Sequence, residues 1–276
     1  MNKNNETSVL KDWAIVLGAS SGFGGATAIE LAKNGFNIIG IHLDRQATLH
    51  NVDTIIKEIE NSGQKADFHN INAADELKRN GVLDDLAMKF KETGEAVKVL
   101  VHSLAFGSLR PYFGKTAADS ITKSQMDMTF DVMANAIVYW TQGLVFRNLL
   151  KPYAKIFALT SSGSREVIPA YGAVSAAKCA IESHIRQISM ELGYMNVSAH
   201  SIMAGVTDTP AMSKIPGAQG MKNVAMQKNP RKRLTTPEEV AQVIAGLCDD
   251  RFSWISGGII NADAGECTTC YTEKTT

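Results

Sequence analysis

Short apolar runs alternate with longer amphipathic stretches along almost the whole chain. The run from Trp13 to Leu17 has the length of a buried strand, and a stretch with helical periodicity follows it and ends at Gly35. Further strands are predicted at 37–43, 66–71, 98–107, 155–162, 197–210 and 257–265. Helices are predicted at 48–61, 75–93, 125–150, 171–193 and 236–247. This alternation predicts an α/β fold with a doubly wound parallel sheet and helices on both of its faces.

No linker rich in proline or glycine divides the chain, and no internal repeat is visible, so we expect a single Rossmann-like domain over residues 12–266. Residues 1–11 are polar and are expected to form a loose leader, and residues 267–276 a C-terminal tail. The segment 211–230 combines methionines with glycines and prolines and has no clear periodicity. Such a segment is typical of a flexible lid over a binding site.

Composition and charge exclude several classes of protein. The chain has 276 residues, and 45% of them are hydrophobic, which is ample for a buried core. Its 28 basic residues balance 28 acidic ones, so net charge gives no case for a nucleic-acid partner. No apolar run is long enough to span a membrane, and the first residues lack the apolar core of a signal peptide. The four cysteines are too scattered for a disulfide framework, so we expect a cytoplasmic protein. The lone C-x-x-C at 267–270 has no second pair of metal ligands, so we expect no metal site.

The first predicted strand leads directly into the sequence G-A-S-S-G-F-G at 18–24, and a helix follows. Glycines at these positions let the backbone approach a pyrophosphate, and the helix N-terminus offers free N–H groups to the anion. A strand, a glycine turn and a helix in this order predict a dinucleotide site. Its expected contacts are Gly18, Ser20, Ser21, Gly22, Phe23 and Gly24.

The end of the second strand is where dinucleotide folds meet the adenosine ribose. His42, Asp44 and Arg45 lie there together. Asp44 favours NAD, because a carboxylate binds the 2′-hydroxyl, whereas Arg45 favours NADP, because a guanidinium binds a 2′-phosphate. We expect NADPH, with NADH as the alternative, although either residue would also suit a helix cap. At the end of the next strand, Asn70 and Ile71 are expected to flank the adenine.

Tyr171 and Lys178 are predicted to share one face of a helix. They are seven residues apart, which is roughly two turns and about 10 Å along the axis. A phenol and an ammonium placed in this way suit proton transfer, because a nearby cation favours the phenolate. The alternative is a surface tyrosine and lysine on an ordinary amphipathic helix.

Several of these residues together carry a family resemblance. They are the G-x-x-x-G-x-G at 18–24, Asn135, Ser161, Lys178 and the A-G-V-T-D-T at 204–209. Over roughly residues 10–265 the chain resembles the short-chain dehydrogenase/reductases. Most members carry a tyrosine four residues before the lysine, but Val174 occupies that position here, and Tyr171 gives Tyr-x6-Lys instead. This spacing, with V-H-S-L-A-F at 101–106, is similar to the enoyl-acyl-carrier-protein reductases that keep the ordinary glycine loop.

The resemblance implies roles for individual residues. Tyr171 would donate a hydrogen bond to an enolate oxygen, and Lys178 would bind the nicotinamide ribose. Ser161 would assist Tyr171 or merely end a strand, and Asn135 would hold a helix distortion and a water or be an ordinary buried amide. Ser103 and Leu104 would line the cofactor beneath the nicotinamide, and Thr209 and the Val206–Thr207 backbone would hold its carboxamide. Ala105 and Gly205 are the remaining expected cofactor contacts.

The longer spacing has a chemical reason. In the reduction of an enoyl thioester the hydride goes to C3, and the charge develops on an oxygen two carbons further along. A phenol moved by almost one helical turn, roughly 5 Å, suits that oxygen. The expected activity is therefore NAD(P)H-dependent reduction of the 2,3 double bond of enoyl thioesters in fatty-acid synthesis, on an acyl-carrier-protein or CoA thioester. The alternatives are a carbonyl or β-ketoacyl reductase and a non-catalytic dinucleotide-binding sensor. The resemblance also implies a homo-oligomer, a tetramer or dimer, that packs through the helix at 125–150.

Overall fold

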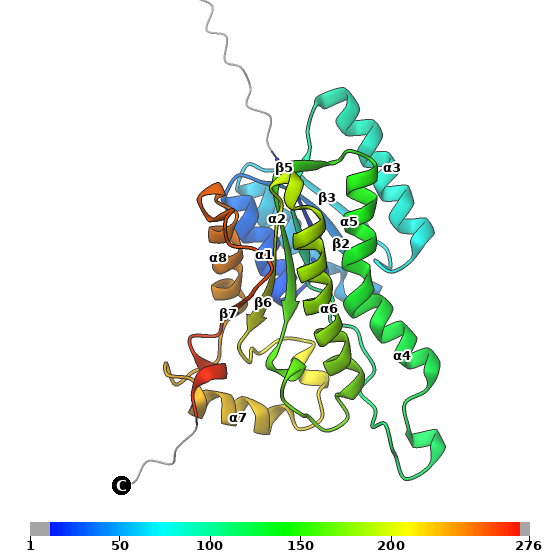
Figure 1. Cartoon of the computed structure of the whole chain (residues 1–276), viewed down its shortest axis with the longest axis vertical. Coiled ribbons are helices and arrows are strands. Elements are labelled where there is room, and N and C mark those ends of the chain that lie inside the picture. The colour runs from blue at the N-terminus through cyan, green and yellow to red at the C-terminus, as the bar shows by residue number, and fades with distance from the viewer. Residues whose placement is uncertain (1–11, 271–276) are drawn as a thin grey trace, which may run out of the picture.

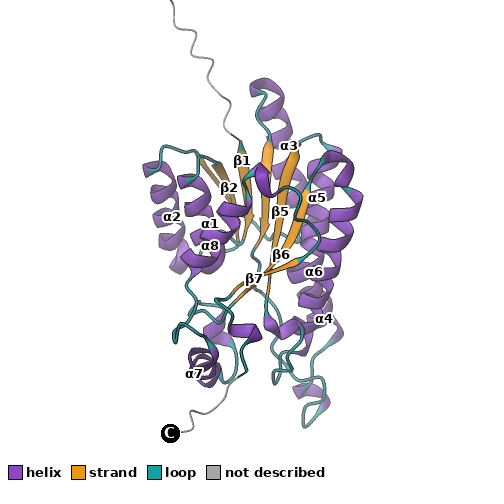
Figure 2. Ribbon diagram, turned by 60° about the vertical axis from the view of Figure 1, so that its left-hand side comes forward, coloured by secondary structure: helices purple, strands orange, loops and turns teal. Residues whose placement is uncertain are grey.

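The sheet of this protein has seven parallel strands in the order β3-β2-β1-β4-β5-β6-β7. The structure is a computed structural model that describes residues 12–270, so the leader predicted at 1–11 and part of the predicted tail lie outside the described residues. Figure 2 shows the sheet between two layers of helices, which confirms the predicted fold. The strands are β1 (Trp13–Leu17), β2 (Asn37–His42), β3 (Ala66–Asn70), β4 (Val97–His102), β5 (Leu150–Thr160), β6 (Ser198–Ala204) and β7 (Ile259–Ala262).

One helical layer contains α1 (Gly22–Lys33), α2 (Leu49–Asn61) and α8 (Pro237–Leu247). The other contains α3 (Glu76–Thr93), α4 (Lys123–Phe130), α5 (Ala136–Phe146) and α6 (Gly172–Glu191). The remaining helix, α7 (Ala218–Lys228), belongs to neither layer and lies beyond the carboxyl ends of the strands (Figure 1). Within residues 12–270, no helix is long and apolar enough to cross a membrane.

Alternate residues of the central strands point to the two layers. In β1, Trp13, Ile15 and Leu17 join the core under α3, α5 and α6, whereas Ala14 and Val16 join the core under α1, α2 and α8. All five are buried, as expected for a parallel strand that is covered on both faces. The strand order reverses between β1 and β4, and this switch point opens a crevice at the carboxyl ends of the two strands.

The helix predicted at 125–150 is wrong in its extent. The structure divides this stretch into α4, a π-helix from Asp131 to Asn135, and α5, which ends at Phe146. Asn148 then takes a left-handed φ of 55° and turns the chain, so that β5 begins at Leu150 rather than at 155. Because apolar residues resume at Leu149, directly after Arg147 and Asn148, hydrophobicity alone does not mark the boundary.

The segment 211–230, which was predicted as a flexible lid because it has no clear periodicity, contains regular structure. It contains a short 3-10 turn from Met212 to Lys214 and the helix α7. Polar contacts tie α7 to the loops beside the crevice: Lys222 Nζ donates to Asp208 Oδ1 at 2.5 Å, and Lys228 Nζ lies 3.4 Å from Glu166 Oε1. Closure of this segment over a substrate stays a prediction.

Candidate active site

The glycine turn between β1 and α1 brings backbone atoms very close together. Gly18 has a φ of +90°, and a Cβ built on it would lie 2.6 Å from the carbonyl oxygen of Ser103. A Cβ on Gly24 would lie 2.0 Å from the carbonyl oxygen of Gly18. The side chain of Ser21 does not cap α1, so the first N–H groups of the helix stay free at its positive end. This cradle fits the pyrophosphate of a dinucleotide.

The other residues of the turn have distinct surroundings. Ser20 hydrogen-bonds toward Asp44, at the end of β2. Phe23 packs against the core of α1 and α8, so its backbone is what faces the cradle. A Cβ on Gly22 would lie 3.4 Å from Cγ2 of Thr209. The structure thus brings the predicted phosphate turn and the predicted nicotinamide loop side by side.

At the adenosine end of the crevice, other side chains hold the Asp44 carboxylate. His42 Nδ1 lies 3.0 Å from Asp44 Oδ2, and Thr48 Oγ1 donates to Asp44 Oδ1 at 2.8 Å. Asn70 exchanges two hydrogen bonds of 3.0 Å with the backbone of Asp44, and the Ile71 N–H donates to the His42 carbonyl at 2.8 Å. Burial raises the pKa of Asp44, but its hydrogen bonds outweigh burial and leave the pKa lowered. His42 and Asn70 therefore position Asp44, and their contact with a cofactor stays a prediction.

Arg45 follows this cluster immediately and differs from it. Its side chain is exposed and has no hydrogen-bond or ion-pair partner among residues 12–270. A free guanidinium at the end of β2 is available to a 2′-phosphate.

The loop after β4 lies under the glycine turn. The Ser103 N–H donates to the Leu17 carbonyl at 2.8 Å, which fixes Ser103 against the turn. Leu104 packs on the core beside α5 and α6, and Ala105 is exposed. Ser103 therefore lies beside the predicted pyrophosphate position rather than only beneath the nicotinamide.

Tyr171 and Lys178 both lie beyond the carboxyl end of β5, at the start of α6. Tyr171 is the N-cap residue of α6, with a φ of −98°, so it precedes the helix on which it was predicted. Lys178 lies inside the helix, and its Nζ donates to the carbonyl of Leu159 at 2.6 Å. The two residues are 9% and 7% exposed, which excludes the alternative of an ordinary surface pair.

Burial acts in opposite directions on the two pKa values. It raises the pKa of Tyr171, and nearby Ser161 offsets only part of this increase. It lowers the pKa of Lys178 to about 8, against the attraction of Glu182. The expectation that Lys178 makes Tyr171 more acidic is therefore wrong for this structure. At neutral pH Tyr171 keeps its proton and Lys178 is mostly charged, so the phenol is a hydrogen-bond donor.

Ser161 and Gly163 form the wall beside the Tyr171 ring. A Cβ on Gly163 would lie 2.7 Å from Cε1 of Tyr171 and 3.2 Å from Oγ of Ser161. The buried Ser161 Oγ reaches no hydrogen-bond partner among the described residues. Ser161 directly follows the end of β5 at Thr160, and its hydroxyl is also available to a substrate oxygen.

Asn135 is the last residue of the π-helix, which is the helix distortion expected there. Its Oδ1 lies 3.3 Å from His184 Nε2. Within the same π-helix, the Val132 carbonyl accepts from Nε2 of His102 at 3.0 Å. Burial and Lys178 lower the pKa of His102 to about 3, so this ring is neutral and structural. π-Helical turns are frequent at functional sites because they redirect backbone groups.

The position of the usual tyrosine, Val174, is filled by packing. Val174 is 3% exposed. A Cβ on Gly107 would lie 2.8 Å from Val174 Cγ2, 2.7 Å from Met133 Sδ and 2.9 Å from Thr129 Cγ2. The loop after β4 therefore closes directly over Val174, and no space remains there for a phenol.

The loop after β6 presents an unpaired backbone to the crevice. The Val206 N–H donates to Glu266 Oε1 at 3.0 Å, and the Val206 carbonyl accepts from the Thr235 N–H at 3.2 Å. The Thr207 side chain donates to the Gly205 carbonyl at 3.0 Å. Thr207 is 4% exposed, yet its own N–H and carbonyl have no partner among residues 12–270. A donor and an acceptor side by side fit the carboxamide of a nicotinamide.

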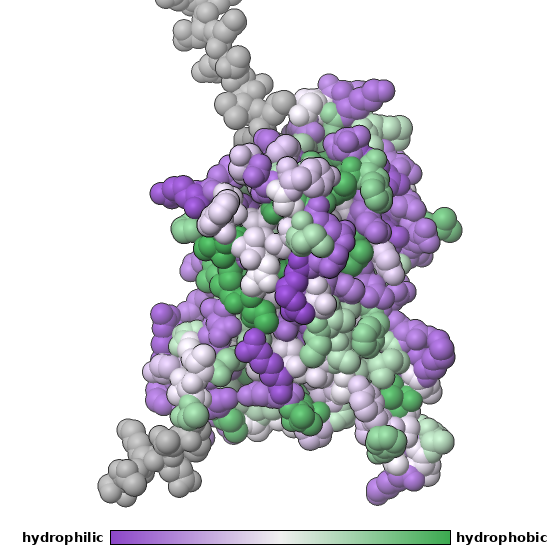
Figure 3. Space-filling model, in the orientation of Figure 1, coloured by the Kyte–Doolittle hydropathy of each residue, from purple (hydrophilic) through white to green (hydrophobic). Residues whose placement is uncertain are grey.

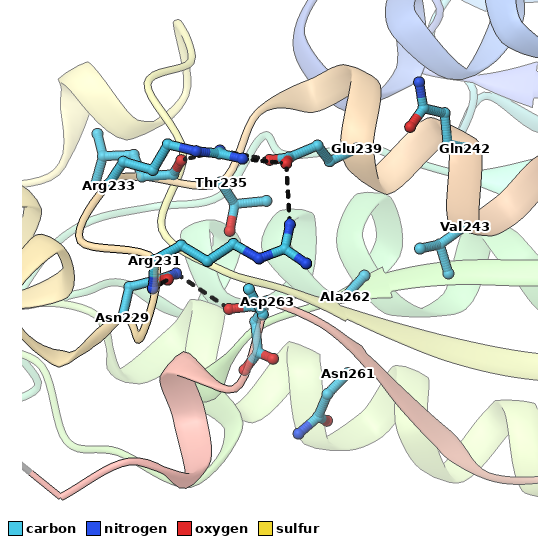
Figure 4. A pocket seen from close by; sticks show the side chains of 12 residues that line it. Asn229, Arg231, Arg233, Thr235, Glu239, Gln242, Val243, Asn261, Ala262 and Asp263 are labelled. Carbon is cyan, nitrogen blue, oxygen red and sulfur yellow. Dashed lines mark hydrogen bonds and ion pairs between the residues drawn. The ribbon is translucent and has the colours of Figure 1, made fainter.

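A separate hollow lies behind this loop, between α8 and β7 (Figure 4). Its volume is about 410 Å³. Arg233 and Glu239 form an ion pair of 2.5 Å at its rim, and Arg231 lies 3.7 Å from the same carboxylate. Tyr171 and Lys178 do not line it, so it is not the reaction site.

Sequence reasoning missed several residues that support the site. Glu182 is buried, accepts from Thr160 Oγ1 at 2.6 Å and faces Lys178; its place four residues after the lysine is the signal that could have found it. Tyr112 lies over the start of α6, where a Cβ on Gly172 would be 2.7 Å from its ring. No local pattern marks Tyr112, because loop 103–122 brings it there from a distance.

Comparison with known proteins gives a consistent family and a mixture of activities. A family model described as enoyl-(acyl carrier protein) reductase matches residues 18–266. An enoyl-acyl-carrier-protein reductase (NADH), FabI, from Synechocystis sp. is 30% identical over 183 residues, which cover 66% of this chain and 69% of that protein. A 3-oxoacyl-acyl-carrier-protein reductase, FabG, from Thermotoga maritima is 25% identical over 251 residues, which cover 91% of this chain and 96% of that one. One similar solved structure is that of an enoyl-acyl-carrier-protein reductase from Anaplasma phagocytophilum in complex with NAD. Its TM-score is 0.80 at 16% identity, and the match covers 97% of this chain and 96% of that one, so the two proteins share the fold.

Proposed function

Because the chain belongs to the enoyl-(acyl carrier protein) reductase family of short-chain dehydrogenase/reductases, and is therefore an oxidoreductase, we propose that it reduces the 2,3 double bond of enoyl thioesters with a nicotinamide cofactor. The observation that carries this proposal is the location of the phenol. Tyr171 lies seven residues before Lys178, and the position four residues before it is filled by Val174 packed against Gly107. The phenol at the start of α6 is thus the displaced one that conjugate reduction requires.

When bound, the reduced nicotinamide supplies a hydride to C3 of the substrate. Tyr171 donates a hydrogen bond to the thioester oxygen, on which negative charge develops, and this stabilises the enolate until a proton from solvent reaches C2 and completes the saturated thioester. The raised pKa of Tyr171 supports the role of donor, because the phenol keeps its proton. The Lys178 ammonium, held by the Leu159 carbonyl, keeps two N–H groups for ribose hydroxyls and keeps the local potential positive.

For the cofactor we propose NADPH. The Asp44 carboxylate is already engaged by His42 and Thr48, whereas the exposed Arg45 side chain has no partner among the described residues and is available to a 2′-phosphate beyond β2. The substrate class is an acyl-carrier-protein or CoA thioester, and the neutral overall charge gives no support to a nucleic acid.

A homo-oligomer is also proposed. Tyr139 and Phe146 of α5 and Met190 of α6 are exposed apolar residues on helices of one layer, and hydrophobic side chains lie among hydrophilic ones on the face shown in Figure 3. Burial of such side chains between subunits is the expected driving force.

The second candidate function is reduction of β-ketoacyl thioesters. It is favoured by Ser161, which stands where ordinary ketoreductases keep their serine and has a free hydroxyl, and by the Thermotoga relative. The test is a parallel assay of matched enoyl and β-ketoacyl thioesters with NADH and with NADPH. The rate of each reaction is measured as oxidation of the cofactor. Faster reduction of the enoyl substrates supports the proposal. Faster reduction of the keto substrates makes it wrong, and cofactor binding without any turnover indicates a sensor.

A further inference from the structure

Glu266 is a buried carboxylate that the reaction described above does not use. It begins the 3-10 turn after β7, Glu266–Thr268 (η8), and is 5% exposed. Its Oε1 accepts a hydrogen bond of 3.0 Å from the Val206 N–H, and its Oε2 one of 3.4 Å from Asn229 Nδ2. A carboxylate is costly to remove from water unless its oxygens are hydrogen-bonded. These contacts therefore point to a specific role.

Glu266 helps to set the direction of the backbone groups at Val206 and Thr207. Glu266 holds the N–H of Val206, and the Thr235 N–H holds the Val206 carbonyl. With both groups of Val206 turned toward the protein, the N–H and carbonyl of the next residue, Thr207, are left for the crevice. Thr207 is buried, and neither of these groups has a partner among residues 12–270. Glu266 and Thr235 therefore hold this orientation through their contacts with Val206.

Close packing keeps the loop in this position. A Cβ on Gly205 would lie 3.2 Å from Glu266 Oε2 and 2.3 Å from Thr235 Oγ1. Asn229, the C-cap residue of α7, donates both to Glu266 and to the carbonyl of Asp263, the latter at 3.2 Å (Figure 4). One carboxylate thus joins the loop after β6, the end of α7 and the C-terminal segment, which are far apart in the sequence.

We propose that Glu266 is a positioning residue for the nicotinamide half of the cofactor. It orients the loop 205–207 so that the Thr207 backbone meets the carboxamide, while the glycine turn binds the other half of the cofactor without it. The inference rests on the proposed function only in that a nicotinamide binds at this loop. Loss of Glu266 therefore weakens binding of the whole cofactor and spares a fragment that lacks the nicotinamide.

The test compares two ligands on purified full-length protein by titration calorimetry. The ligands are NADPH and 2′-phospho-ADP-ribose, which lacks the nicotinamide, and NADH and ADP-ribose are titrated in parallel. Glu266→Leu leaves the Val206 N–H without an acceptor, and we expect the Kd for the complete cofactor to rise about tenfold. The Kd for the fragment should stay within about twofold, because its contacts are remote. Glu266→Gln keeps a carbonyl acceptor for Val206 and should restore most of the affinity.

Two outcomes overturn the proposal. Equal weakening of cofactor and fragment would make Glu266 a general support of the fold, and unchanged cofactor binding in Glu266→Leu would remove its role altogether. If Glu266→Leu does not fold, Glu266→Asp, whose shorter side chain does not reach Val206, is put through the same comparison. The titrations contain no thioester, so they remain valid if the enoyl substrate is wrong. Failure of the unmodified protein to bind either cofactor would overturn the proposed function as well.

Discussion

Replacing Tyr171 by phenylalanine removes a single O–H group from the crevice. The phenyl ring retains its packing on Gly163, and the neighbouring Ser161 side chain is the polar group that acts on the phenol. We therefore expect the free energy of unfolding to change by no more than about 1.5 kcal/mol. The glycine turn, Lys178 and the loop 205–207 are untouched, so the Kd for the cofactor should stay the same.

The rate should respond very differently. Tyr171 is 9% exposed, and burial raises its pKa, so its proton is presented to the substrate oxygen with little competition from water. Loss of one such oxyanion donor costs on the order of 10²–10³ in kcat. Ser161→Ala is the matched control, because it removes the neighbouring hydroxyl, which has no partner, and should cost much less.

The assay combines steady-state kinetics on an enoyl thioester with cofactor titration and thermal unfolding of the same preparation. A loss of kcat below about tenfold, at unchanged stability, would show that another group carries the oxyanion. A larger loss in Ser161→Ala than in Tyr171→Phe would assign that role to Ser161 and refute the spacing argument.

Four further predictions follow from single side chains. The KM for the cofactor should be constant at neutral pH and should rise above about pH 8, because Lys178 then loses its proton. Lys178→Ala should weaken cofactor binding and turnover together, and should abolish this pH dependence of KM. Arg45→Ala should raise the KM for NADPH much more than that for NADH, and equal effects would contradict the 2′-phosphate contact. Lys155 is fully buried, its Nζ has no partner among the described residues, and burial lowers its pKa, so Lys155→Met should stabilise the fold by about 1–3 kcal/mol in urea unfolding. Because the unfolded state binds the proton more tightly, wild-type stability should also rise with pH between the lowered pKa and 10.5, and the variant should lose this slope. Val174→Tyr should destabilise the protein by about 1–3 kcal/mol through overpacking against Gly107 and should gain no keto reduction, which activity assays on the soluble fraction would check.

Local pattern was enough to predict the parts of the fold that depend on local chemistry. The strand at Trp13–Leu17 is found as predicted, because five apolar residues before a glycine turn have few other solutions. The helix predicted at 236–247 is found as α8, in which Thr236 and Glu239 form a capping box and Pro237 is the first residue.

The supporting residues of the site could not be predicted in this way. The π-helix before Asn135 leaves the apolar pattern of its stretch unchanged, and the contact of Glu266 with Val206 joins segments 60 residues apart. The direction of the Tyr171 pKa also depends on burial, which the sequence spacing with Lys178 does not show. Chemistry-bearing residues were thus visible in the sequence, whereas the groups that orient them become visible only through tertiary packing.

The contact between Gly107 and Val174 has a consequence for how this protein can diverge. A tyrosine at 174 is larger than the valine that already packs against Gly107, and a side chain at 107 needs space that Val174, Met133 and Thr129 occupy. The two positions are therefore epistatic: the effect of a substitution at one depends on the residue at the other. Single mutational steps toward the ordinary tyrosine spacing pass through overpacked, less stable intermediates. A change of reaction requires the loop after β4 and the helix α6 to change together, and this raises a barrier to the exchange of one activity for the other.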